Sequence, residues 1–173
     1  MQQRLVITGA GGLLGWHVAS RLHAANCAAR YRNETVPFHL SLLDHESFQS
    51  NSRLDEALSG ADAVLHFAGV NRGTEEEVKD GNPAIARRLA DACARMGVKP
   101  HVVYANSTHA RLETLYGVSK RRAADILGGI GGGLYFFMQA WRRNEKVQAF
   151  MDRLMLKLPI FGVMVDKSCV ARW

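Results

Sequence analysis

Short runs of apolar and β-branched residues alternate, over the first 126 positions, with longer segments whose apolar positions recur every three or four residues. The short runs are typical of buried parallel strands, and the longer segments have the period of amphipathic helices. This alternation predicts an α/β fold built on a doubly wound parallel sheet. The expected strands are Arg4–Thr8, Cys27–Tyr31, Phe38–Leu43, Ala61–Gly69 and His101–Ala105.

Four segments have helical periodicity. Helices are expected over Leu13–Asn26, over Leu54–Leu58, from Glu75 to a C-cap at Gly97, and from Tyr116 onward. His66 lies inside an expected strand, so we interpret it as a core residue rather than a catalytic one.

Gly9, Gly12 and Gly15, three residues apart, stand where the first expected strand meets the first helix. Gly9 permits a tight turn, Gly12 lets the backbone approach a pyrophosphate, and Gly15 lets helix and strand pack closely. The helix N-terminus then presents free N–H groups to a phosphate. A plain structural turn is the alternative, but the position between strand and helix favours a dinucleotide-binding loop that includes Leu13 and Leu14.

A tyrosine and a lysine open the last of the expected helices. Tyr116 and Lys120 are four residues apart and therefore share a helix face, where the ammonium favours the phenolate form of the tyrosine. Ser107, or alternatively Thr108, stands at the end of the preceding strand and would hydrogen-bond a substrate carbonyl. The three residues Ser107, Tyr116 and Lys120 are the predicted catalytic residues of a hydride-transfer enzyme; an exposed helix face is the alternative for the tyrosine–lysine pair.

Charge and cysteine content narrow the function classes. The net charge is +6, but the first 126 residues carry only +2 and the last 47 carry +4. A sign-mixed surface gives no reason to expect a nucleic-acid partner. Cys27, Cys93 and Cys169 form neither a disulfide framework nor a metal-ligand cluster, so we expect no metal and a cytoplasmic location. The N-terminus lacks a signal-peptide pattern.

The spacing Thr8-Gly9-x-x-Gly12-x-x-Gly15, followed by Tyr-x-x-x-Lys, resembles the extended short-chain dehydrogenase/reductases, also called the NAD-dependent epimerase/dehydratase family. The resemblance covers residues 4–126 and implies a Rossmann-like NAD(P)-binding domain over residues 1–126. It also implies that Asp44 contacts the adenine.

The expected cofactor pocket has a basic side. Arg30 and Arg32 stand at the end of the expected second strand, where guanidinium groups suit a 2′-phosphate, so NADP is the predicted cofactor and NAD the alternative. Solvent-exposed arginines beside a loop are the other interpretation. Ala68 and Gly69 leave room for the nicotinamide ribose.

Within the family, the closest resemblance is to nucleotide-sugar reductases of capsule and O-antigen synthesis. It rests on the segment 66–72, on Gly81-Asn82 and on the short gap between Ser107 and Tyr116. It implies reduction of a 4-keto group on a UDP-linked sugar, with Asn71, Arg72 and Asn82 near the substrate. Ala105 and Asn106 depart from the family, which usually has serines there.

Residues 127–173 are predicted to be foreign to this fold. They contain most of an uncharged run, Ile126–Trp141, and then a basic amphipathic helix. The run is just short of the length that spans a bilayer. The segment from Arg142 to Trp173 resembles an internal part of the type II secretion F family, the platform proteins of type IV pili. The tail therefore predicts membrane contact through Ile126–Trp141 and inner-membrane association, or alternatively a helical cover for the sheet edge.

The sequence supports three hypotheses. The first is a nucleotide-sugar oxidoreductase, which would be inactive if the missing sixth strand and substrate domain are indispensable. The second is a dinucleotide-binding module without turnover. The third is a membrane-associated fragment of a secretion platform. The sequence specifies neither the sugar nor the oligomeric state.

Overall fold

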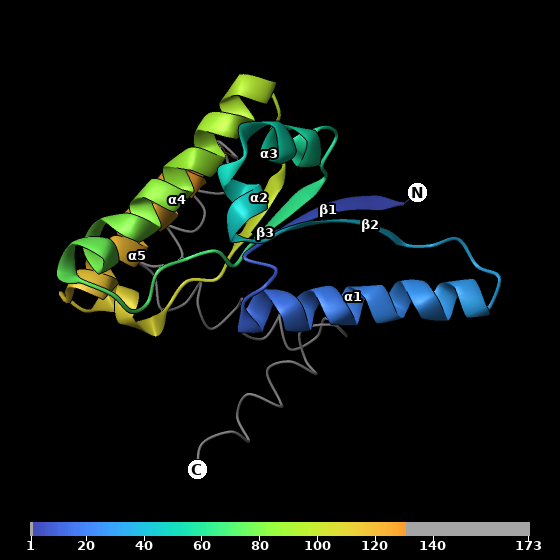
Figure 1. The fold of residues 1–173 in the computed structure, drawn as a ribbon, viewed down its shortest axis with the longest axis horizontal. Helices are drawn as coiled ribbons and strands as arrows, with labels where there is room; N and C mark the ends of the chain where they lie inside the picture. Colours follow the sequence, from blue (N-terminus) through green and yellow to red (C-terminus); the bar gives the residue numbers. More distant parts are fainter. Residues whose placement is uncertain (1, 131–173) are drawn as a thin grey trace, which may run out of the picture. The chain divides into compact units, whose positions relative to one another are not determined.

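The computed structural model describes residues 2–130. Strands and helices alternate in it along the chain (Figure 1). The predicted α/β, Rossmann-like class is confirmed. The elements are β1 (Gln3–Thr8), α1 (Leu13–Tyr31), β2 (Phe38–Leu43), α2 (His45–Gln49), α3 (Asn51–Leu58), β3 (Ala63–His66), α4 (Glu75–Met96), β4 (His101–Tyr104), the 3-10 turn η1 (Thr108–Arg111) and α5 (Leu115–Gly128).

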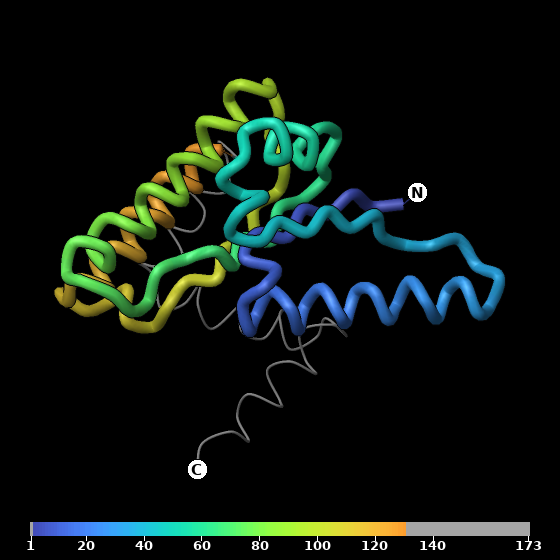
Figure 2. The backbone as a smooth tube through the Cα atoms, viewed as in Figure 1, coloured from blue at the N-terminus to red at the C-terminus, as the bar shows by residue number. Residues whose placement is uncertain are grey.

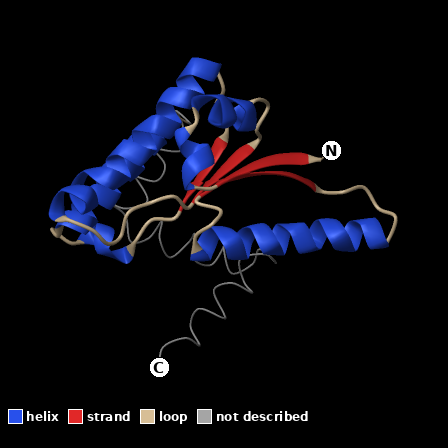
Figure 3. Ribbon diagram, in the orientation of Figure 1, coloured by secondary structure: helices blue, strands red, loops and turns tan. Residues whose placement is uncertain are grey.

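The four strands form one parallel sheet in the order β2-β1-β3-β4 (Figure 3). Their last residues stand in register, because Thr8 pairs with both Leu43 and His66, and His66 pairs with Tyr104. The loops that follow these four residues therefore leave from one edge of the sheet. In parallel sheets, ligands bind at this edge, where the strand order reverses.

Helices cover both faces of the sheet, with α1 on one side and α4 and α5 on the other (Figure 1). Alternate strand residues point to opposite faces, so Val6 and Val64 enter the core beneath α4 and α5. Leu127 and Ile130 are also buried in this core, at 4% and 8% exposure. The predicted boundary after residue 126 thus falls inside α5, which continues to Gly128.

The predicted strand Cys27–Tyr31 is wrong, because these residues form the last turns of α1. The segment 24–29 contains four alanines, and alanine has the highest helix propensity. Asn26, a weak helix former, is buried there because its amide exchanges two hydrogen bonds with the backbone of Phe38. The strand beside β1 is consequently the one predicted third, Phe38–Leu43.

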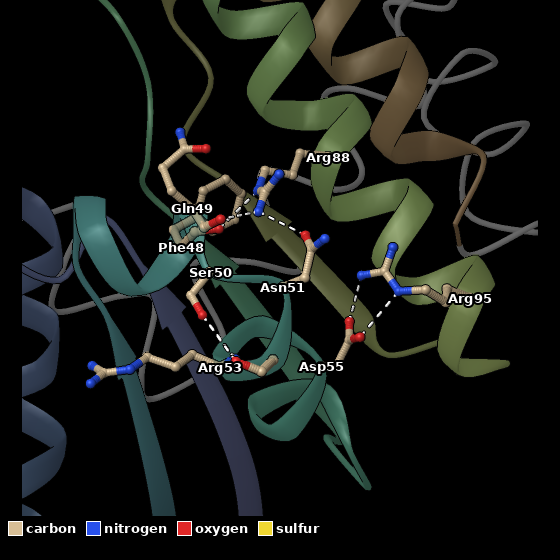
Figure 4. A network of polar contacts seen from close by, with 9 residues as sticks. Phe48, Gln49, Ser50, Asn51, Arg53, Asp55, Arg88 and Arg95 are labelled. Carbon is tan, nitrogen blue, oxygen red and sulfur yellow. Dashed lines mark hydrogen bonds and ion pairs between the residues drawn. The ribbon is translucent and has the colours of Figure 1, made fainter.

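The α2–α3 segment is tied to α4 by two arginines (Figure 4). Arg88 donates to the carbonyl oxygens of Phe48 and Gln49 and to the side chain of Asn51. Arg95 forms an ion pair with Asp55 in α3. These contacts fix the segment that directly follows Asp44, which caps α2.

The predicted helices over residues 54–58 and 75–97 are confirmed, and Gly97 ends α4 in the left-handed conformation.

The predicted tail lies outside the described residues from position 131 onward, as does most of Ile126–Trp141. Within residues 2–130, no helix is both long and apolar enough to cross a membrane.

Candidate active site

The loops after β1, β3 and β4, three of the four that leave this edge of the sheet, carry many of the predicted site residues (Figure 2). Backbone hydrogen bonds continue the strand register into these loops. Phe67 N–H donates to the carbonyl of Thr8, and Ala105 N–H donates to the carbonyl of His66, each at 3.1 Å. The predicted site residues in these loops are therefore brought close together.

The loop after β1 is packed so tightly that glycine is required at two positions. Gly9 has a φ of 68°, and a Cβ there would lie 2.6 Å from the backbone nitrogen of Ala68. A Cβ on Gly15 would collide with the carbonyl oxygen of Gly9. Gly12 is the N-cap of α1 and has no side chain to cap the helix. This loop and helix N-terminus fit a dinucleotide pyrophosphate, because free N–H groups and the helix dipole favour an anion there.

The other predicted cofactor residues near this loop differ in exposure. Leu13 and Leu14 are exposed, at 75% and 57%, in the first turn of α1. Ala68 contacts the glycine loop, and Gly69 lies beside α5, since a Cβ on Gly69 would stand 3.8 Å from the Nζ of Lys120. These two small residues join the loop after β1 to the helix that carries the tyrosine and lysine.

The core assignment of His66 is confirmed. Its side chain is 1% exposed, and its Nδ1 lies 2.7 Å from the Oγ1 of Thr8. Burial, and secondarily the charge of Lys120, lowers the pKa of His66 to about 4. A neutral imidazole therefore joins the last residues of β1 and β3 beneath the loops.

Lys120 is buried, at 5% exposure, and its ammonium reaches the end of β4. Nζ donates to the carbonyl oxygen of Ala105 at 2.7 Å and stands 4.2 Å from the ring centroid of Tyr104. Burial lowers the pKa of Lys120 to about 8. The lysine is therefore mostly protonated at neutral pH and is fixed at the sheet edge.

Ser107 and Tyr116 stand at the two ends of the loop that connects β4 to α5. The Oγ of Ser107 accepts from the N–H of His109 at 3.2 Å, which leaves its own proton free to donate. Thr108, the predicted alternative, is exposed at the start of η1. Tyr116 is half-buried in the first turn of α5, edge-to-face with the ring of His109.

This loop is held against α5 by contacts that the sequence analysis missed. Arg121 donates to the carbonyls of Ala110 and Leu112 and pairs with Glu113. A Cβ on Gly117 would meet the carbonyl oxygens of His109 and Leu112. The glycine directly after Tyr116 was the one signal in the sequence for such close packing.

The predicted substrate residues separate into two groups. Asn71 and Arg72 are exposed in the loop between β3 and α4. Asn82 is buried, at 3% exposure, and its amide bonds to both backbone groups of Val70 and to the Oγ of Ser119. Both amide protons of Asn82 are thus engaged in joining this loop to α5.

Arg30 and Arg32 were predicted to stand at the end of a strand, and this placement is wrong. They lie at the C-terminal end of α1, where Arg30 is about 27 Å along the helix from Gly12 at 1.5 Å per residue and Arg32 is the C-cap. Arg32 forms an ion pair with Glu34 there. The residue that directly follows the second strand of the sheet is instead Asp44.

Asp44 is exposed at the sheet edge, with its carboxylate oriented by α2. Both bonds to its side chain come from Ser47 and end on Oδ1, leaving Oδ2 for another donor. The hydrogen bond from the Ser47 side chain is the main reason why the pKa of Asp44 lies below its usual value. Asp44 is therefore an anion at neutral pH.

Comparison with known proteins agrees with this geometry. Residues 5–126 match the NAD dependent epimerase/dehydratase family. The chain belongs to this family. The match contains the glycine loop, Asp44 and the Tyr-x-x-x-Lys pair.

Two relatives in this epimerase/dehydratase family are informative. The chain is 32% identical over 170 residues to a UDP-2-acetamido-2,6-beta-L-arabino-hexul-4-ose reductase of Pseudomonas aeruginosa, covering 91% of this chain and 42% of the reductase. The crystal structure of the capsular polysaccharide assembling protein CapF from Staphylococcus aureus has a TM-score of 0.56 and 27% identity, covering 75% of this chain and 32% of that one. The chain thus spans less than half the length of either relative.

The tail is similar to a different protein. A segment of 48 residues is 42% identical to the type IV pilus assembly protein PilC of Pseudomonas aeruginosa, covering 28% of this chain and 13% of PilC.

Within residues 2–130, no group of three His, Cys, Asp or Glu side chains could hold a metal ion.

Proposed function

We propose that this epimerase/dehydratase-family chain carries the dinucleotide-binding and catalytic half of an oxidoreductase that reduces a 4-keto group on a nucleotide sugar. The buried, protonated Lys120, held at the sheet edge beside Gly69 and one helical turn from Tyr116, is the observation that carries this proposal. The name of the Pseudomonas reductase supports the substrate class.

Ser107, Tyr116 and Lys120 have separate roles in the proposed carbonyl reduction. A bound reduced nicotinamide supplies the hydride for the carbonyl carbon. Ser107 donates a hydrogen bond to the carbonyl oxygen, and Tyr116 gives that oxygen its proton. The ammonium of Lys120 stabilises the phenolate that Tyr116 becomes. Asn71 and Arg72, exposed beside the site, are our candidates for substrate contact, with Thr108 a further one.

The test of this function has two stages. We expect saturable binding of NADH or NADPH to the full chain, measured by nicotinamide fluorescence, and then oxidation of the bound cofactor on addition of a UDP-4-keto sugar. Binding without oxidation would favour the second hypothesis, a dinucleotide-binding module. Absence of saturable binding would contradict both.

For the cofactor, we propose NAD(H) in preference to NADP(H). In this fold a carboxylate at the end of the second strand accepts hydrogen bonds from the ribose hydroxyls, and its charge repels a 2′-phosphate. Asp44 has this position and a free Oδ2, whereas Arg30 and Arg32 are at the far end of α1. The position of Asp44 and the distance of Arg30 from the glycine loop are the observations that support this preference.

Replacing Asp44 by asparagine tests this preference. Asparagine keeps a side-chain oxygen that can cap α2 but removes the charge, so we expect the Kd ratio of NADPH to NADH to fall about tenfold. Fluorescence titrations of both cofactors give the ratio. As the matched control, Arg30→Ala and Arg32→Ala should leave it within about twofold. Loss of NADPH binding in either arginine variant would restore the NADP assignment.

A further inference from the structure

The ammonium of Lys120 has an unusual environment for a buried charge. Among residues 2–130, the ion pairs involve three arginines, and no carboxylate pairs with this lysine. An ammonium has three N–H donors, and the one described hydrogen bond goes to the carbonyl oxygen of Ala105. A buried cation with a single neutral acceptor needs another source of stabilisation.

The ring of Tyr104 supplies a negative surface at the right place. The Nζ of Lys120 stands 4.2 Å from its centroid, well inside the distance of about 6 Å at which a cation is attracted to an aromatic face. Tyr104 is the last residue of β4 and directly precedes Ala105. Two successive residues of one strand end thus hold the same ammonium, by the ring of the first and the carbonyl of the second.

Tyr104 is itself firmly placed. Its ring packs against His66, with centroids 5.7 Å apart, and its hydroxyl is buried without a hydrogen-bond partner among the described residues. Burial, with a smaller contribution from Tyr116, raises the pKa of the Tyr104 phenol. The phenol is therefore neutral, and its hydroxyl makes no contact that would explain a tyrosine here. The ring face is the part of the side chain that Lys120 uses.

We propose that Tyr104 is a positioning residue, whose aromatic face holds the ammonium of Lys120 at the end of β4, beside Gly69, so that the lysine stays charged and in place for Tyr116. This inference deepens the proposed function and rests on it for its catalytic meaning. The physical claim, an aromatic ring that stabilises the charged form of a buried lysine, can be tested without cofactor or substrate.

The titratable groups around Lys120 define what else could move its pKa. They are Tyr104 on β4, His66 on β3 and Tyr116 on α5 itself. His66 is neutral above about pH 4, and the phenol of Tyr104 is neutral throughout the accessible range. Variants that change only the ring at position 104, with His66 and Tyr116 unchanged, therefore report the effect of that ring on the titration of Lys120.

The experiment is an NMR titration of the lysine side chains in the full chain, with Lys120 assigned by substitution and the exposed Lys79 and Lys99 as internal references. In the wild type we expect Lys120 to titrate near 8. Tyr104→Phe keeps the ring face and should leave that value unchanged. Removing the ring in Tyr104→Leu should lower it by about one unit, because a cation–π contact stabilises only the protonated lysine.

Fluorinated phenylalanines at position 104 separate this electrostatic role from simple packing. Mono-, di- and trifluorination leave the shape nearly unchanged but progressively withdraw negative charge from the ring face. We expect the pKa of Lys120 to fall stepwise along the series, while those of Lys79 and Lys99 stay constant. A flat series would overturn the proposal, even if Tyr104→Leu fails to fold.

Turnover supplies the functional readout. If Tyr104 acts through Lys120, the pH above which turnover declines should move downward in step with the NMR titration across the fluorinated series. Cofactor affinity at pH 6, where every variant is protonated at Lys120, should stay within about twofold. An unchanged pH profile alongside a shifted lysine pKa would contradict the positioning role. An absent turnover in the wild type would instead count against the proposed function alone, since the NMR result does not depend on it.

Discussion

Replacing Tyr116 by phenylalanine is expected to lower the rate of NADH oxidation by a UDP-4-keto sugar about 10²- to 10⁴-fold, the usual contribution of a positioned proton donor. Phenylalanine keeps the half-buried ring and its edge-to-face contact with His109 but has no proton to give. Cofactor affinity should change by less than about twofold, since the loss affects the transition state. Stopped-flow absorbance of the nicotinamide measures the rate, and fluorescence titration measures the affinity.

The chain offers a matched control for this variant. Tyr31 is 90% exposed at the end of α1, away from the sheet edge that carries the site. Tyr31→Phe removes the same hydroxyl and should leave the rate unchanged. Equal rates for Tyr116→Phe and the wild type would remove Tyr116 from the reaction, and equal losses in both variants would indicate a general effect on the fold.

Replacing Gly15 by alanine is expected to abolish most cofactor binding and to destabilise the domain. In a helix, alanine is normally favoured over glycine by about 1 kcal/mol. Here the new methyl would collide with the carbonyl of Gly9 and lie 2.9 Å from the Cα of Ala10. We expect the free energy of unfolding to fall by about 1–3 kcal/mol, as in other overpacked sites, and NADH affinity to fall more than about tenfold as the loop is displaced.

Gly11 provides the comparison within the same loop. It is exposed, and a Cβ there would meet no atom within 4 Å. Gly11→Ala should therefore leave the stability within about 0.5 kcal/mol of the wild type. Urea unfolding followed by circular dichroism gives the stabilities, and nicotinamide fluorescence gives the affinities. A Gly15 variant as stable and as tightly binding as the Gly11 variant would show that the close packing of the loop is unnecessary.

Much of the fold is predictable because the strongest local signals agree with one another. The strand before the glycines, the strand Phe38–Leu43 and the helix ended by Gly97 all combine periodicity with a clear terminus. The strand expected at Cys27–Tyr31 had neither. Its alanines favour a helix, and the one polar residue that argues against a helix, Asn26, is accommodated by hydrogen bonds to Phe38, twelve positions away.

The error in that strand changed the cofactor prediction. Counting one strand too many put Arg30 and Arg32 at the sheet edge and gave Asp44 the neighbouring place. In the structure α1 extends to Tyr31, with Arg30 in its last turn and Arg32 as its C-cap, so the edge position beside the glycine loop is occupied by Asp44. Assigning one strand wrongly in a parallel sheet changes which residues are predicted to bind the ligand, because each strand end contributes its own residue to the ligand site.

Local spacing is sufficient to identify two features of the candidate site: the glycines where strand and helix meet, and a tyrosine and lysine one helical turn apart. The groups that surround these residues are known from the folded chain alone. In the fold, the ring of Tyr104 and the carbonyl of Ala105 contact the ammonium of Lys120. Buried Asn82 connects the loop after β3 to α5, and Arg121 holds the loop after Ser107. These contacts join elements that are far apart along the chain, and their partners depend on strand order and register, which no local pattern records.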